Sequence, residues 1–236
     1  MNDVLDARTG VKDTLPTVLG YIGIGMAFGI IAHTNGFSPL ETLLMSLMVY
    51  TGSGQFALVS MLPAGISLLS MFMAVSLMSA RMLLMCMTLA PKFKKEKLAK
   101  NLWLSFLITD ETFALAITKL NYTKGKLNYD WMNASNIVAY AAWTLAGLAG
   151  CLLGNLVSDT KALGLDYAVI AMFLGLLYLQ LITDQSLKIE LQLIMIGVTM
   201  VLTYIGMIIL PASATTIVVT VVSCLVGMGI KHVYFK

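Results

Sequence analysis

The chain has 236 residues, of which 58% are hydrophobic and only 11% are charged. Its mean hydropathy is +0.87, whereas an average soluble domain carries about 25% charged residues. This composition excludes a soluble protein and predicts an all-α polytopic membrane protein. The formal net charge of +3 suits cytoplasmic loops that face anionic lipid, and it gives no indication of nucleic acid binding.

A polar N-terminal segment, residues 1–15, precedes the first apolar run, so we expect a single membrane domain over residues 16–236. A helix needs roughly 20 apolar residues to span the bilayer. The chain has eight such runs, and we expect seven to eight transmembrane segments because one of the early runs can be re-entrant. The runs are residues 16–32, 40–61, 65–90, 102–120, 134–157, 167–183, 191–210 and 212–230.

The orientation of the chain depends on a basic loop. Residues 91–100 include five lysines, and the positive-inside rule places such a loop in the cytoplasm. If all eight segments cross, the later lysines, such as Lys119, fall outside, which the rule disfavours. If one of the first three segments is re-entrant, the N-terminus moves inside with Arg8 and Lys12. We favour this re-entrant arrangement.

The stretch Tyr-Thr-Gly-Ser-Gly-Gln-Phe, residues 50–56, interrupts the second apolar run. Irregular backbone at membrane depth must be buried in protein or line a cavity, and broken helices near the midplane often form transporter binding sites. Glycines can equally serve a close helix crossing. We predict a broken or re-entrant helix with non-helical backbone near residues 52–54, and substrate contacts from Gly52, Ser53, Gly54 and Gln55.

Three ionisable residues, Arg81, Asp110 and Glu111, lie inside apolar runs. Such residues are rare and mark functional sites by default, although a structural ion pair is the alternative. Arg81 and Asp110 each lie about 15 Å from the basic loop in a regular helix, which is about half of a 30 Å hydrocarbon core. We therefore predict an ion pair between Arg81 and one of the two acids. The other acid remains for a substrate ammonium or a coupling proton.

Polar and aromatic side chains share a face of the fifth apolar run. Asn136, Tyr140 and Trp143 are spaced i, i+4 and i+7, so they lie on one side of a helix. This face can line the cavity, with Asn136 and Tyr140 contacting a substrate. It can equally form an interhelical hydrogen bond with aromatic residues at an interface.

Small residues also recur at helical spacing. Gly25 and Gly29 lie in the first run, and Gly147, Gly150 and Gly154 lie in the fifth. Both sets predict close helix–helix packing.

No pattern of a soluble enzyme is present in the sequence. There is no P-loop and no Ser/His/Asp set with an intramembrane histidine. Asp110 and Glu111 point about 100° apart as consecutive helical residues, so they cannot act face to face as a catalytic dyad. Three cysteines lie in apolar runs without metal-ligand spacing. We expect no enzyme activity, no cofactor and no metal site.

Several short motifs, in this order and spacing, resemble the AzlC family, the large subunit of branched-chain amino-acid exporters. The resemblance runs from about residue 16 to the C-terminus. Two departures concern Ser53-Gly54, where the family commonly has Ala-Ser, and the neighbours of Arg81, where Ser79 and Met82 replace polar residues. The motifs are Leu19-Gly20-Tyr21, Ala27-Phe28-Gly29, Gly36-Phe37-Ser38-Pro39, residues 50–56, Thr109-Asp110-Glu111 and Phe113-Ala114.

The resemblance implies a multi-pass permease of the bacterial inner, or cytoplasmic, membrane that works with a small AzlD-type membrane subunit. It implies export of valine, leucine, isoleucine or analogues, and in some members methionine. We expect the glycine face at residues 147–154 to be available to the small subunit. In a binding model, the substrate carboxylate contacts backbone N–H groups at residues 52–54 and the ammonium pairs with Asp110 or Glu111. A passive channel for a small neutral or anionic solute is the alternative.

Overall fold

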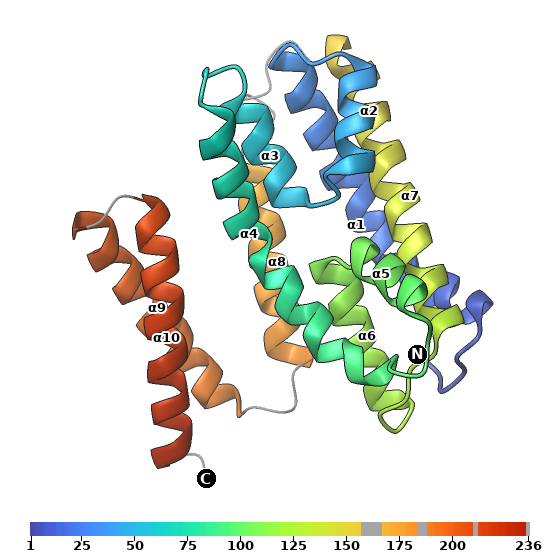
Figure 1. Cartoon of the computed structure of the whole chain (residues 1–236), viewed down its shortest axis with the longest axis vertical. Coiled ribbons are helices and arrows are strands. Elements are labelled where there is room, and N and C mark those ends of the chain that lie inside the picture. Colours follow the sequence, from blue (N-terminus) through green and yellow to red (C-terminus); the bar gives the residue numbers. More distant parts are fainter. Residues whose placement is uncertain (157–166, 184–187, 210–211, 235–236) are drawn as a thin grey trace. The chain divides into compact units, whose positions relative to one another are not determined.

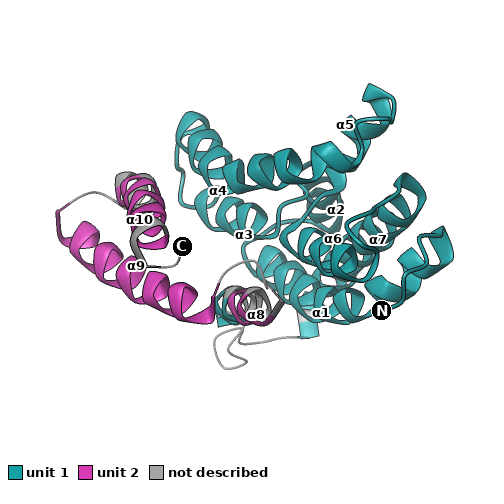
Figure 2. Cartoon of the chain, turned by 90° about the horizontal axis from the view of Figure 1, so that it is seen from below, with its two compact units in different colours: residues 1–176 teal, residues 177–236 magenta. Residues whose placement is uncertain are grey.

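The computed structural model describes residues 1–156, 167–183, 188–209 and 212–234, and every regular element among them is helical. The chain forms two compact units, residues 1–176 and 177–236 (Figures 1 and 2). The expected all-α class is confirmed. The helices are α1 (Ala7–Thr34), α2 (Pro39–Met48), α3 (Gly52–Met61), α4 (Leu68–Leu89), α5 (Leu98–Leu107), α6 (Asp110–Tyr122), α7 (Tyr129–Leu153), α8 (Ala168–Thr183), α9 (Ile189–Ile209) and α10 (Ala212–Tyr234), with the 3₁₀ turns η1 (Ala90–Lys92) and η2 (Gly154–Leu156).

Four helices within the described residues are long and apolar enough to cross a membrane: α1, α4 with η1, α7 and α9. The expected seven to eight crossings are therefore not confirmed. The main reason is that the apolar runs at residues 40–61 and 102–120 each fold as two short helices, α2–α3 and α5–α6.

Helix α1 begins at Ala7, nine residues before the apolar run that predicted it. The side chain of Asp6 caps the helix by accepting a hydrogen bond from the backbone N–H of Thr9 at 2.7 Å. Hydrogen bonds from Thr9 lower the pKa of the Asp6 carboxyl. Much of the expected polar segment is thus the first turns of α1.

Helices α1 and α7 pack along each other through the two glycine faces. A Cβ atom on Gly29 would lie 2.0 Å from the carbonyl oxygen of Gly147, and one on Gly150 would lie 2.2 Å from that of Met26. Gly154 likewise lies against His33. The close packing is confirmed, but the glycine face of α7 is covered by α1. The expectation that this face is available to a second subunit is wrong.

We expect Gly150→Ala to destabilise the protein strongly, because the added methyl group meets backbone atoms that cannot rotate away. Overpacking typically costs about 1–3 kcal/mol. Gly20→Ala is the matched control, since a Cβ atom there meets nothing within 4 Å. Thermal unfolding in detergent should show a lower midpoint for Gly150→Ala alone. Equal midpoints for the two variants would contradict this packing.

Helices α2 and α3 form a hairpin that enters and leaves at one end of the first unit. The start of α2 lies beside the C-terminal end of α7, where the Thr42 hydroxyl donates to Cys151 Sγ at 3.3 Å. After Met61 the chain continues into α4, which runs to the opposite end of the unit (Figure 1). Figure 1 shows α2 and α3 meeting in the middle of the unit. The broken element that the sequence predicted in residues 40–61 is therefore present as two helices that turn back on each other.

Helices α5 and α6 form a second hairpin, which enters from the other end (Figure 1). The loop after α6 returns beside the end of α4, where Lys92 Nζ donates to the carbonyl oxygen of Gly125 at 3.0 Å. The helix is interrupted between α5 and α6, because Ile108 and Thr109 have extended backbone. The prediction of one continuous span over residues 102–120 is therefore wrong.

Apart from Arg81, the basic residues that the structure describes in the first unit gather at the end where α5 and α6 enter. Helix α1 begins there too, since Asn128 at the start of α7 donates to the carbonyl oxygen of Leu5. At the opposite end, residues 34–67 contain no lysine or arginine. The basic side chains are Arg8, Lys12, Lys92, Lys94, Lys95, Lys97, Lys100, Lys119, Lys124 and Lys126.

Candidate functional site

The tips of the two hairpins meet between α1, α4 and α7. They enclose a small pocket of about 20 Å³, just enough for one water-sized group. Helices α3 and α6 both begin at this pocket, so two helix N-termini, which favour negative charge, converge on it. We call it the tip pocket. Its lining residues are Tyr21, Tyr50, Gly52, Ser53, Met82, Thr109, Asp110, Glu111 and Trp143.

The break in the first hairpin lies at residues 49–51, not at the glycines. Gly52, Ser53 and Gly54 form the first turn of α3, and the Thr51 side chain makes no capping hydrogen bond to it. The predicted break near residues 52–54 is therefore present, but residues 52–54 are themselves helical and the non-helical backbone lies three residues earlier. Gly54 is required for packing, because a Cβ atom would lie 2.8 Å from Thr51 Cγ2 and 3.2 Å from Val75 Cγ1.

Arg81 connects α4 to both hairpin tips. Its Nη2 lies 2.8 Å from Asp110 Oδ2 on α6 and donates to Ser53 Oγ on α3 at 3.3 Å. The predicted ion pair is confirmed, and Asp110 is the partner of Arg81. A single guanidinium thus holds the two tips together at the depth where the helices are interrupted.

Glu111 has a different environment from its neighbour. The hydroxyl of Tyr21 donates to Glu111 Oε2 at 2.6 Å and lies 2.7 Å from Thr109 Oγ1. The ion pairs among the described residues do not include Glu111. A capping box between Thr109 and Thr112 starts α6 and fixes the position of the acidic pair.

Gln55 lies behind the tip pocket and does not line it. Its amide is fully buried, with Nε2 donating to Ser46 Oγ at 3.2 Å and Oε1 accepting from Trp143 Nε1 at 2.7 Å. Both ends of the amide therefore connect α3 to neighbouring helices. Trp143, in turn, lines the tip pocket.

Asn136 and Tyr140, on α7, do not line the tip pocket. The Asn136 amide is fully buried and donates to the carbonyl oxygen of Leu104 at 3.4 Å, while its Oδ1 has no hydrogen-bond partner. Tyr140 packs edge-on against Tyr50, with ring centroids 4.7 Å apart, and its hydroxyl donates to the carbonyl oxygen of Leu47 at 2.8 Å. Both residues therefore support the hairpins from α7.

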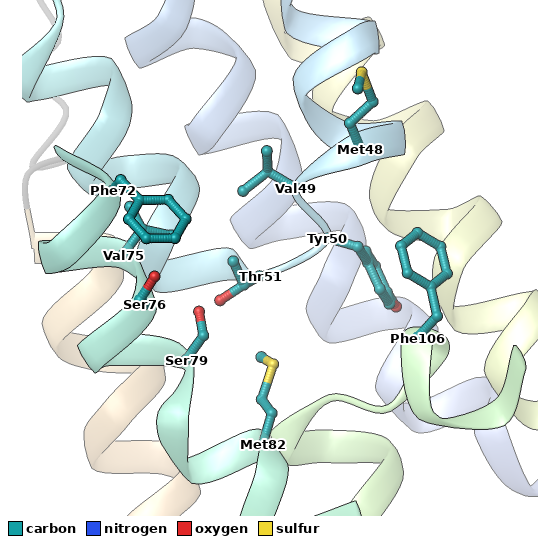
Figure 3. Close-up of a pocket in the computed structure, with 10 residues that line it drawn as sticks. All are labelled: Met48, Val49, Tyr50, Thr51, Phe72, Val75, Ser76, Ser79, Met82 and Phe106. Carbon is teal, nitrogen blue, oxygen red and sulfur yellow. The ribbon is translucent and has the colours of Figure 1, made fainter. Parts of the chain in front are cut away.

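A larger pocket of about 290 Å³ adjoins the tip pocket and shares Tyr50 and Met82 with it. We call it the side pocket (Figure 3). The hydroxyls of Thr51 and Ser79 are buried without a hydrogen-bond partner, and Figure 3 shows both oxygens directed into the space between α3 and α4. These two hydroxyls can donate or accept hydrogen bonds on the pocket side. The lining residues are Met48, Val49, Tyr50, Thr51, Phe72, Val75, Ser76, Ser79, Met82 and Phe106.

The protein has long apolar helices and two apolar segments that are each broken into a hairpin, with charged groups at the breaks. These features define an integral membrane protein built from discontinuous helices. The chain matches the family model described as AzlC protein over residues 16–157 and belongs to this family. No solved structure matches it.

Relatives cover most of the chain. It is 32% identical to the inner membrane protein YgaZ of Escherichia coli strain K12 over 198 residues, which is 81% of this chain and 80% of that protein. It is 31% identical to an uncharacterized membrane protein of Helicobacter pylori strain J99, with 75% and 76% covered. It is 26% identical to the branched-chain amino acid transport protein AzlC of Bacillus subtilis strain 168, with 71% and 65% covered.

Proposed function

We propose that this chain is a permease that exports apolar L-amino acids, namely valine, leucine, isoleucine and methionine, by secondary transport. The observation that carries the proposal is the convergence of two helix N-termini and three charged groups beside an apolar pocket. The name of the Bacillus subtilis relative, a branched-chain amino acid transport protein, supports the substrate class.

The basic end of the first unit supports a cytoplasmic position for the N-terminus, by the positive-inside rule. In this orientation α5–α6 is the cytoplasmic hairpin and α2–α3 is the extracellular one. The protein is then a multi-pass protein of the bacterial cytoplasmic membrane. Transporters with discontinuous helices bind their substrate where the interruptions meet and open to one side at a time.

The substrate α-carboxylate fits the N-terminus of α3. The N–H groups of Gly52, Ser53 and Gly54 form the first turn of that helix, which carries no acidic residue and no side-chain cap. Such N–H groups bind anions. Arg81 lies beside them through its contact with Ser53.

The substrate ammonium fits Glu111, because Asp110 is already neutralised by Arg81. The aliphatic side chain extends into the side pocket, where methionine, valine and phenylalanine side chains supply apolar contacts. Gln55, Asn136 and Tyr140 then act by holding the hairpins in place.

A carrier fits the geometry better than a passive channel. The tip pocket has a volume of only about 20 Å³, and Arg81 bridges the two tips across it. Passage past the tips therefore requires a rearrangement of the hairpins, which makes flux saturable. Flux that stays proportional to leucine concentration would favour the channel.

A small AzlD-type membrane subunit completes the proposed exporter. Since α1 covers the glycine face of α7, the subunit must contact another surface of the chain. Full leucine export by this chain alone in liposomes would contradict the requirement.

We expect Ser79→Phe to abolish leucine export. Ser79 lines the side pocket from α4 (Figure 3), so an aromatic ring at this position would fill the pocket. Leu77→Phe is the matched control on the same helix, since Leu77 is exposed and does not line the pocket. Export of labelled leucine from proteoliposomes that contain the small subunit measures both variants. Equal flux from the two would remove the side pocket from the substrate path.

A further inference from the structure

Glu111 is the one charged group at the tip pocket whose charge is not balanced by an ion pair within the described residues. Its carboxylate accepts from a neutral hydroxyl, that of Tyr21. The pocket in front of it holds about 20 Å³, which accommodates one water-sized group but not two. Protonation neutralises the carboxylate, and a neutral carboxyl group cannot form an ion pair with an ammonium, so the proton and the ammonium are alternatives.

We propose that Glu111 binds either a proton or the substrate ammonium, never both, and that this competition makes the protein a proton/amino-acid antiporter. This inference rests on the proposed function. It assigns Asp110 and Glu111 different roles: Asp110 pairs with Arg81 and holds the hairpin tips together, and Glu111 exchanges its cation in every cycle.

The charged and titratable groups around Glu111 come from four elements. Tyr21 donates to it from α1, and Tyr50 lines the same pocket from the turn between α2 and α3. Asp110 precedes it on α6 and is paired with Arg81 on α4. Trp143, which lines the pocket from α7, does not titrate. Within the described part of the chain, no second cation at the pocket competes for Glu111.

The proposed exchange balances in atoms and charge. When the site faces the cytoplasm, the zwitterionic substrate enters, its ammonium pairs with the Glu111 carboxylate, and the proton leaves the carboxyl group to the cytoplasm. When the site faces outward, a proton from outside binds the carboxylate and the amino acid leaves. Each turnover therefore exports one neutral amino acid and imports one proton, so it moves one positive charge inward.

Linkage gives a direct readout of this competition. If the proton and the ammonium compete for one carboxylate, leucine binding must release a proton from the protonated protein. We expect about one proton released per leucine bound when Glu111 is protonated at the start. Leucine affinity should also fall about tenfold for each pH unit below the pH at which Glu111 is half protonated.

The experiment is calorimetric titration of leucine into the purified full-length chain with its small subunit, in buffers of different ionisation enthalpy. Wild type should release protons on binding, whereas Glu111→Gln should bind leucine more weakly and release none. Glu111→Asp keeps the acid and should restore the release. Glu96→Gln, an acid-to-amide change in the basic loop, is the matched control and should resemble wild type.

Two binding results would overturn the inference: leucine binding to wild type with neither proton release nor a change of affinity with pH across the acidic range, or unchanged release from Glu111→Gln. A leucine flux in proteoliposomes that responds to a sodium gradient and not to pH or membrane potential would also overturn it. The absence of any binding of leucine, valine or methionine is a different outcome, because it contradicts the proposed function itself.

Discussion

Arg81→Met should prevent stable assembly of the protein, because it leaves Asp110 without its cation between two helix tips. Arg81 Nη2 lies 2.8 Å from Asp110 Oδ2, near the middle of α4. An ionised aspartate at the centre of a membrane helix costs about 2.5–3.5 kcal/mol. Fluorescence-detected size-exclusion chromatography should show loss of the monodisperse peak.

Two double variants test which acid is the ion-pair partner of Arg81. Arg81→Met with Asp110→Asn removes both charges and should recover the monodisperse peak, although leucine export stays low. Arg81→Met with Glu111→Gln should not recover it, because Asp110 remains unpaired. Recovery by the Glu111 variant and not by the Asp110 variant would show that the ion pair is assigned to the wrong acid.

Lys119→Met should destabilise the α5–α6 hairpin to a similar degree. Lys119 is fully buried, and its Nζ lies 2.8 Å from Asp13 Oδ2 on α1 and 5.4 Å from the ring of Trp131 on α7. The Trp131 indole also donates to Asp13 Oδ2 at 3.1 Å. Removing one partner of a buried ion pair costs about 3–5 kcal/mol.

The measurement is the thermal unfolding midpoint in detergent, with Lys95→Met as the control at an exposed lysine of the basic loop. Replacing both partners, as Lys119→Met with Asp13→Asn, should recover most of the loss. A Lys119→Met midpoint equal to that of Lys95→Met would show that this contact does not anchor α6.

The sequence predicted the class of the fold, the interruption of the second apolar run and the pairing of Arg81. Each depends on a local signal: hydropathy marks membrane helices, glycines weaken a helix, and a charge at membrane depth needs a partner. The lysine distribution also favoured one re-entrant element near the N-terminus, and α2–α3 is the hairpin that fits this prediction.

The second hairpin was not predicted because no glycine or proline marks residues 108 and 109. A signal was present, since Thr109-Asp110-Glu111-Thr112 has the polar N-cap and acidic first turn of a helix start. Inside an apolar run this pattern suggested intramembrane charge alone. The structure shows that it also begins α6.

The environment of Gln55 depends on tertiary contacts that the sequence pattern does not encode. An amide in an apolar run needs hydrogen-bond partners, and the pattern suggested a substrate as one of them. Because α3 turns back along α2, the amide meets Ser46 and Trp143 instead. The sequence did not predict Thr51 and Ser79 as site residues, because hydroxyl side chains are common in apolar helices. Only the fold shows that these two are buried without a hydrogen-bond partner.

The central claim is that an apolar amino acid binds where the hairpin tips meet the side pocket. The most direct test is substrate protection of Ser79→Cys from a maleimide, in a background where Cys86 and Cys224 are replaced by alanine and Cys151 remains buried. Leucine should slow labelling of this cysteine in a saturable manner, and glutamate should not, while labelling of Leu77→Cys stays unchanged. Labelling of Ser79→Cys that leucine does not affect, in a preparation that still exports leucine, would place the substrate elsewhere and contradict the account.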